Sequence, residues 1–166
     1  MSSRTENSSD VRLQKVVVRN VVKTFGSTAA LRGVETRVQT RLLSALEIGG
    51  NYIYQRAENR TPFSFERGND LPNAPRHRLN ARIALDLARA GVYCEFSRES
   101  RHFLDRANLR TVPVRMLHHL GGRVPLVEGV VLSWALRNLS DNRVADLWGY
   151  PLPGRSYALA MHYIIH

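Results

Sequence analysis

The stretch Arg78-Leu79-Asn80-Ala81-Arg82-Ile83-Ala84-Leu85-Asp86-Leu87 alternates strictly between apolar and polar or small residues. Every second side chain from Leu79 to Leu87 is apolar, and the residues between them are polar or small. A repeat of two residues is typical of a β-strand with one apolar face, so we expect a strand over residues 78–87. The stretch is also rich in Ala, Leu and Arg, which favour helices, so a helix over residues 79–90 is the alternative.

The same alternation recurs along the chain. It is found in seven further segments, residues 13–20, 31–42, 45–56, 92–98, 111–118, 126–138 and 156–165. The connections alternate between short turns at residues 43–44, 88–91 and 121–123 and long loops at residues 57–75, 99–110 and 139–155. Short turns at one end and long loops at the other are typical of outer-membrane barrels. We therefore expect an all-β fold, an antiparallel up-and-down meander of about eight strands that forms part of an outer-membrane β-barrel.

Composition is consistent with such a barrel but does not prove it. Of the 166 residues 43% are hydrophobic, and the mean hydropathy is -0.28. We find no apolar run of about 18 residues, so no transmembrane helix is expected. Tyr or Trp lies near the ends of several apolar faces, as in an interfacial girdle, at Tyr52, Tyr54, Trp134, Tyr157 and Tyr163. A soluble β-sandwich with an aromatic core would explain the same pattern.

The net charge of +10 suggests a polyanionic partner. The basic residues are mostly scattered arginines rather than a run that could follow phosphates. A soluble basic β-sheet protein that binds nucleic acid on aromatic platforms is the alternative function. Such platforms need aromatic residues on the basic face, whereas Tyr52, Tyr54, Tyr157 and Tyr163 are predicted to lie on the opposite face. We therefore expect no nucleic-acid partner.

No catalytic residue or metal ligand is predicted, and no cofactor. The adjacent His118 and His119 would point to opposite faces of a strand, so they could not share one metal ion. The single cysteine, Cys94, excludes an intrachain disulfide. We find no nucleophile elbow and no glycine-rich phosphate loop, so the chain is not expected to be an enzyme.

Three segments resemble the C-terminal barrel of TonB-dependent receptors. Arg32-Gly33-Val34-Glu35, followed by Tyr52-Ile53-Tyr54, is similar to the family's "RGVE" and "YxY" strands. Leu71-Pro72-Asn73-Ala74-Pro75-Arg76-His77-Arg78-Leu79-Asn80 resembles its "LPxxPxHxLN" segment, and Asn138 to Arg155 resembles its closing "NLFD…PGR" block. The residues that carry the resemblance are Arg32, Gly33, Glu35, Pro72, Pro75, Asn138, Pro153, Gly154, Arg155, Tyr157 and Tyr163.

The resemblance implies a receptor that takes up a scarce ligand, such as a ferric siderophore or cobalamin, across the cell outer membrane. The partners it implies are outer-membrane lipid, the plug and N-terminal barrel strands of the receptor, and TonB through them. In this family the ligand meets the outer loops, so Arg60, Phe63, Phe65, Arg67, Trp148 and Tyr150 are the candidates for ligand binding. Gly33, on the lumen side, would let another backbone come close.

The sequence departs from the family pattern. Residues 1–10 are polar and are expected to be disordered, with residues 11–166 as the barrel segment. The start has no apolar signal segment, so export of the chain as written is not expected. Ser140 stands at the family's Phe position, and the chain ends Tyr163-Ile164-Ile165-His166 rather than in an aromatic residue. Because no plug or TonB-binding segment is present, we expect a fragment that is not active alone.

Overall fold

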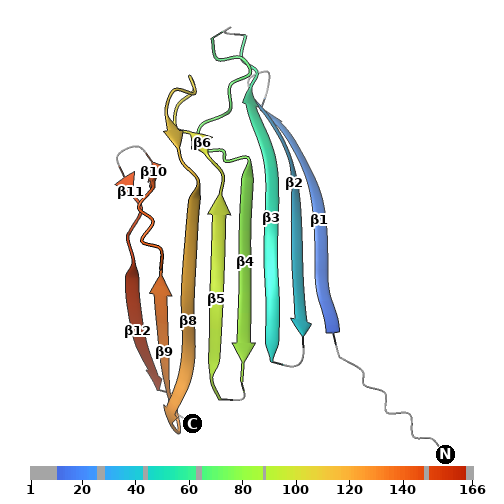
Figure 1. The fold of residues 1–166 in the computed structure, drawn as a ribbon. Helices are drawn as coiled ribbons and strands as arrows, with labels where there is room; N and C mark the ends of the chain where they lie inside the picture. The colour runs from blue at the N-terminus through green and yellow to red at the C-terminus, as the bar shows by residue number, and fades with distance from the viewer. Residues whose placement is uncertain are drawn as a thin grey trace, which may run out of the picture.

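The computed structural model describes residues 11–25, 29–42, 45–62, 65–87, 89–147 and 150–163, and every regular element in these ranges is a β-strand (Figure 1). Residues 78–86 of this stretch lie in a strand, so the helical alternative is wrong. In the described ranges, no helix is found that is long and apolar enough to cross a membrane. The expected disorder at residues 1–10 and the expected turn at residues 43–44 lie outside the described residues.

The described residues form one eight-stranded sheet and two small hairpins. The sheet strands are, in order, β1 (Val11–Phe25), β2 (Ala29–Leu42), β3 (Leu46–Asn59), β4 (His77–Asp86), β5 (Gly91–Glu99), β8 (Arg115–Val127), β9 (Val130–Arg137) and β12 (Ser156–Tyr163). The hairpin strands are β6 (His102–Phe103) with β7 (Thr111–Val112), and β10 (Ala145–Leu147) with β11 (Tyr150–Pro151). The expected meander of about eight strands is confirmed.

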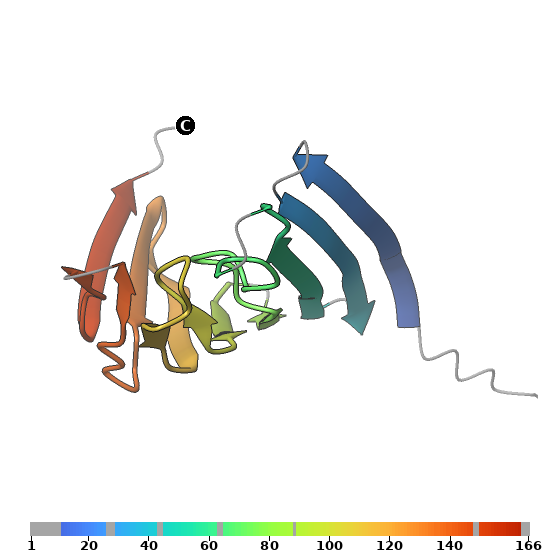
Figure 2. The same ribbon diagram turned by 90° about the horizontal axis from the view of Figure 1, so that it is seen from above.

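Neighbours in the sheet are also neighbours in the chain, apart from the two hairpins inserted in loops. All seven pairs are antiparallel, as a meander requires. Seen from above, the sheet is a single curved layer whose edge strands, β1 and β12, stand apart (Figure 2). Among the described residues, neither edge strand has a partner on its outer side, so the sheet is open.

Residues 121–123 do not form the short turn that the sequence suggested. Gly121, Gly122 and Arg123 lie in the middle of β8, and the turn to β9 is at Glu128-Gly129, where Gly129 has a φ of 75°. The two glycines serve cross-strand packing instead. A Cβ at Gly121 would lie 2.5 Å from the ring of Tyr93, and one at Gly122 would lie 2.6 Å from the carbonyl oxygen of Gly91.

Several strand boundaries also differ from those expected. Because β8 runs to Val127, the predicted segments at residues 111–118 and 126–138 are divided differently, and β9 begins at Val130. The strand β3 continues to Asn59, so the first long loop begins later than residue 57. The first strand is also longer than residues 13–20.

The alternation in the sequence becomes two unlike faces of the sheet. Register places Tyr52 opposite Leu79, Ile83 opposite Cys94, and Leu136 opposite Tyr157, so one face is apolar from strand to strand. Its side chains are largely exposed, for example 51% for Ile83 and 73% for Leu159. We call this surface the apolar face and the opposite one the polar face.

The sheet has almost no interior core. Among the described residues, the buried hydrophobic side chains are Ala57 and Val112, at the loop end of the sheet. A soluble sandwich would cover its apolar face with a second sheet, but the only other sheets among the described residues are the two short hairpins in the loops. Exposed apolar surface of this extent marks a face that the surroundings complete.

Candidate functional site

The long loops at one end of the sheet are tied to one another. The side-chain amide of Asn69 donates to the carbonyl oxygen of Arg106 at 2.8 Å. The backbone N–H of Asn73 donates to the carbonyl oxygen of Phe103, also at 2.8 Å. These bonds join the loop between β3 and β4 to the β6–β7 hairpin. The side chain of Asn108, in the amide orientation that satisfies both partners, bonds the backbone N–H and carbonyl of Asp70 at 2.8 and 2.9 Å.

We call the loop between β3 and β4, together with the β6–β7 hairpin bonded to it, the loop platform. Charged groups reinforce it. A hydrogen bond from the Arg76 guanidinium to Asp70, 2.9 Å long, raises the pKa of Arg76. Burial acts to raise the pKa of Asp105, but the backbone N–H groups of Leu109 and Arg110 that donate to its carboxylate act against it, and the net effect is a lowered pKa. The carboxylate thereby closes the tip of the β6–β7 hairpin.

A buried asparagine anchors the loop between β9 and β12. The Asn138 side chain is only 4% exposed and donates to the carbonyl oxygens of Asn142 and Pro153 at 2.8 and 3.0 Å. It also accepts the backbone N–H of Asn142 at 2.9 Å. Asn138 has a φ of 51°, a left-handed conformation that asparagine tolerates better than most residues. One side chain thus joins the two ends of this loop.

Asp141 makes a second contact across the same loop. Its carboxylate accepts the backbone N–H of Arg155 at 2.8 Å and pairs with the Arg143 guanidinium at 3.2 Å. The hydrogen bond from Arg155, followed by the one from Arg143, lowers the pKa of Asp141. A Cβ at Gly154 would lie 2.6 Å from the Asp141 carboxylate, so a larger residue there would displace the Asp141 side chain from its contact with Arg155. The structure thus brings together Asn138, Pro153, Gly154 and Arg155 of the third motif.

The second motif joins the first long loop to β4. Pro75 is fully buried, and its carbonyl oxygen accepts the Gln55 side-chain amide at 3.0 Å. The Tyr52 hydroxyl lies 2.7 Å from Nδ1 of His77, and the His77 ring lies 5.2 Å from that of Tyr54. Pro72, by contrast, is half-buried in a turn. This motif therefore sets where the pairing of β4 with β3 begins.

In the first motif, the close approach at Gly33 comes from the neighbouring strand. A Cβ there would lie 2.7 Å from the carbonyl oxygen of Tyr54. Arg32 is exposed on the apolar face, and Glu35 pairs with Arg37 at 3.3 Å on the polar face. Tyr157 and Tyr163 lie near the two ends of β12 on the apolar face, opposite Leu136 and Val130.

The candidate ligand-binding residues fall in two separate loops. Arg60, Phe65 and Arg67 are exposed in the loop between β3 and β4, and Tyr150 is exposed in the loop between β9 and β12. The strands β5 and β8 lie between these loops in the sheet, so the structure does not gather the residues into one site. Phe63 and Trp148 lie outside the described residues.

The polar face is hollowed near its middle. A cavity of about 510 Å³ is lined from five consecutive strands, β2, β3, β4, β5 and β8, which places it on the concave side of the curved sheet. Its charged side chains are Arg37, Glu47, Arg82 and Glu95. Arg82 pairs with Glu95, so the surface is polar yet partly neutralised.

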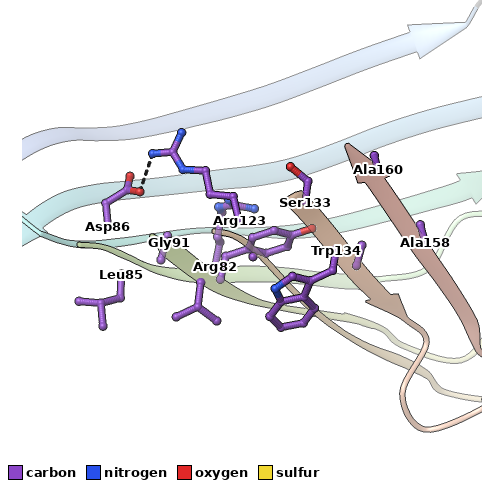
Figure 3. Close-up of a pocket in the computed structure, with 14 residues that line it drawn as sticks. Arg82, Leu85, Asp86, Gly91, Arg123, Ser133, Trp134, Ala158 and Ala160 are labelled. Atoms are coloured by element: carbon purple, nitrogen blue, oxygen red, sulfur yellow. Dashed lines mark hydrogen bonds and ion pairs between the residues drawn. The ribbon is translucent and has the colours of Figure 1, made fainter. Parts of the chain in front are cut away.

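A second hollow of about 460 Å³ lies on the polar face toward β12 (Figure 3). Arg123 and Asp86 point to one side of the sheet and pair at 2.8 Å, whereas Leu85 and Trp134 point to the other side. Small residues, among them Ala158 and Ala160, line the rest. Such a surface leaves room for another polypeptide or for water.

Aromatic rings gather on the apolar face, with Tyr93 as an exception on the polar face. Arg82 stacks over the Tyr93 ring at 4.2 Å from its centre. This ring therefore already packs against a cation of the chain and against Gly121. The described residues thus do not show the row of aromatic platforms on a basic face that would bind single-stranded nucleic acid.

The histidines do not form a metal site in the part of the chain that the structure describes. No group of three or more His, Cys, Asp or Glu side chains that could hold a metal ion is found in that part. His118 packs on Phe96 at 5.1 Å on the apolar face. Nδ1 of His119, next in sequence but on the polar face, accepts the backbone N–H of Asn138 at 3.2 Å.

The loop platform and the Asn138 anchor were missed by the sequence analysis. Their bonds join residues far apart in the chain, such as Asn69 and Arg106, and period-2 alternation carries no information about them. One available signal was the frequency of Asn and Asp in the long loops. Asn73, Asn108, Asn138 and Asp141 all have a positive φ, as these residue types often do in turns.

Several solved structures are similar to this chain, and three of them are receptors. The siderophore receptor PiuA from Acinetobacter baumannii is 22% identical, with a TM-score of 0.74, over 81% of this chain and 22% of the receptor. The ferric yersiniabactin uptake receptor FyuA from Yersinia pestis is 20% identical, with a TM-score of 0.66, over 81% of this chain and 22% of the receptor. The ferric-catecholate import receptor Fiu from E. coli is 15% identical, with a TM-score of 0.68, over 81% of this chain and 21% of the receptor. No protein-family model and no curated protein sequence matches the chain.

The fold is therefore that of a piece of a receptor barrel wall. The chain spans about a fifth of the length of these three structures. The resemblance to TonB-dependent receptor barrels that the three sequence motifs carry is confirmed at the level of the fold. These three structures are named as receptors.

Proposed function

We propose that the chain is a segment of the barrel wall of an outer-membrane uptake receptor. The observation that carries the proposal is the pair of unlike faces on one curved sheet. Among the described residues, the apolar face carries exposed large hydrophobic side chains on seven of the eight strands, all except β9, and the concave side is lined by paired charges and small residues. A lipid-facing exterior and a wet lumen require this arrangement.

The connections indicate the orientation of the sheet. The chain reverses between Leu87 and Ala90, whose backbone groups bond each other, and again at residues 128–129; both short connections lie at the same end, whereas the long loops lie at the other end (Figure 1). In outer-membrane barrels short turns face the periplasm and long loops face the outside. The platform at Asn69 and the anchor at Asn138 then belong to the outer surface of the cell.

The open edges imply further strands. Within the described part of the chain, β1 and β12 have no partner strand on their outer sides, and a lipid environment tolerates unpaired backbone groups only when other strands pair with them. We infer that the remaining strands of a receptor close the barrel. A plug in the lumen would then contact the polar face near Arg82 and Arg123. TonB would act on the receptor through the plug.

We propose that the ligand is a scarce chelate such as a ferric siderophore or cobalamin. The support comes from three of the similar structures, which are a siderophore receptor, a ferric yersiniabactin uptake receptor and a ferric-catecholate import receptor. The outer loops of this chain offer cations at Arg60 and Arg67 and aromatic rings at Phe65 and Tyr150. Cations and aromatic rings suit an anionic, ring-bearing chelate.

Membrane partitioning tests the proposal. The chain should sediment with membranes, resist extraction by salt and dissolve in detergent, because the apolar face has no partner within the described part of the chain. A stable monomer in buffer without detergent would contradict the proposal. Oligonucleotide binding that falls steeply as salt rises would instead favour the soluble basic sheet protein.

A further inference from the structure

The apolar face is bordered by cationic or histidine side chains at the loop end of four adjacent strands. On each strand, the residue two positions beyond the last apolar one shares its face. Val34 is followed by Arg32 on β2, Tyr54 by Arg56 on β3, Leu79 by His77 on β4, and Phe96 by Arg98 on β5. We call Arg32, Arg56, His77 and Arg98 the border row.

At the other end of the apolar face, β4 and β8 have no such border of cationic or histidine side chains. Beyond Leu85 on β4 the chain continues to Leu87, which is 58% exposed. Beyond Val124 on β8 it continues to Leu126, which is 51% exposed. The positive charge is therefore confined to the end that carries the long loops.

The charges of the border row are incompletely matched by the chain. Arg32 and Arg56 are directly opposite each other on β2 and β3, a like-charged pair that destabilises a sheet unless an anion lies near. Glu58 pairs with Arg56. Among the described residues, no carboxylate pairs with Arg32 or Arg98, and Arg98 lies between Leu79 and Met116 on the neighbouring strands.

We propose that the border row binds the phosphate groups of lipid headgroups in the leaflet that faces the long loops. The inference rests on the proposed function, because it requires lipid against the apolar face. Arginine presents several N–H donors that match phosphate oxygens, and a long side chain at the border can reach from the apolar band to the headgroups. The Tyr52 hydroxyl and His77, which lie 2.7 Å apart, add polar groups at the same level.

The test compares co-sedimentation of the full chain with two kinds of vesicle that have the same acyl chains. One is phosphatidylcholine alone, and the other contains phosphatidylglycerol as well. The double variant Arg32→Gln/Arg98→Gln is compared with Arg41→Gln/Arg106→Gln, which removes the same charge from the polar face and a loop. Circular dichroism of the bound chain shows whether each variant keeps its β-structure.

The native chain and the control variant should bind the anionic vesicles more tightly than the neutral ones. The border variant should lose about fivefold of this preference for each arginine removed and keep its binding to neutral vesicles. An unchanged preference in the border variant, or an equal loss in the control, would overturn the headgroup site alone. No binding to either kind of vesicle would overturn the proposed function, and the headgroup site with it.

Discussion

The two faces of the sheet are made from the same strands but are completed in different ways. On the polar face, charges meet within the chain, as in the Arg115–Glu99 pair at 2.7 Å and the Arg123–Asp86 pair at 2.8 Å. On the apolar face, large side chains such as Leu159 and Met161 are about two-thirds or more exposed. The polar face is thus satisfied by its own sequence, whereas the apolar face requires its surroundings.

A charge placed at the centre of β4 should separate the two faces most strongly. Ile83→Arg puts a cation on the apolar face, where a charge at the middle of a bilayer costs about 2–4 kcal/mol. Ala84→Arg, the next residue, puts the same charge on the polar face opposite Tyr93 and near Glu47, and should cost much less. The measurement is the free energy of unfolding in urea from lipid vesicles, followed by tryptophan fluorescence. Equal losses for both variants would remove the distinction between the faces.

Adjacent glycines in β8 test packing on each face separately. The new Cβ of Gly122→Ala would meet the Gly91 carbonyl oxygen and the Trp134 ring, so backbone must shift, at a cost of about 1–3 kcal/mol. The Cβ of Gly121→Ala would meet the Tyr93 ring, a side chain that can be removed. The loss from Gly121→Ala should therefore be largely relieved in the double variant with Tyr93→Ala, as a double-mutant cycle would measure. Strict additivity in that cycle would contradict the packing role of Gly121.

The smallest expected effect lies outside both faces, at Asp141. Because hydrogen bonds lower the pKa of this carboxylate in the folded chain, its stabilising contribution is complete above its unfolded pKa, about 3.9, and is lost as pH falls through the lower folded value. Hydrogen exchange of the Arg155 N–H, corrected for its intrinsic rate, should therefore show protection that disappears in acid. Asp141→Asn should weaken that protection at neutral pH and remove most of its dependence on pH. Protection that is independent of pH in the native chain would exclude the carboxylate as the acceptor.

The sequence predicted the strands well where each had one apolar face. Residues 78–87 were expected as a strand, and β4 spans His77–Asp86. The same reasoning failed at Gly121-Gly122, because glycines in a strand that make room for cross-strand rings look like a turn when only the chain itself is considered. Register decides between these two interpretations, and register is a property of two strands.

The outer loops could be predicted only in position. Their length and proline content marked them as loops, but the bonds that shape them join distant segments. Asn69 bonds Arg106, and Asn138 bonds Pro153, in pairs that no local pattern connects. The residues proposed to meet a ligand therefore remain a prediction from the family resemblance and the chemistry of their side chains.

The meander order of the strands bears on how the sheet assembles. Each sheet strand pairs with the strand before it, so the chain between two partners is short apart from the three long loops. Folding by such near-neighbour contacts closes small loops and is favoured kinetically over pairings between distant segments. Each new hairpin also leaves a free edge onto which the next strand can pair. The sheet can therefore grow one hairpin at a time from either side, and the edges of β1 and β12 are where further strands would pair.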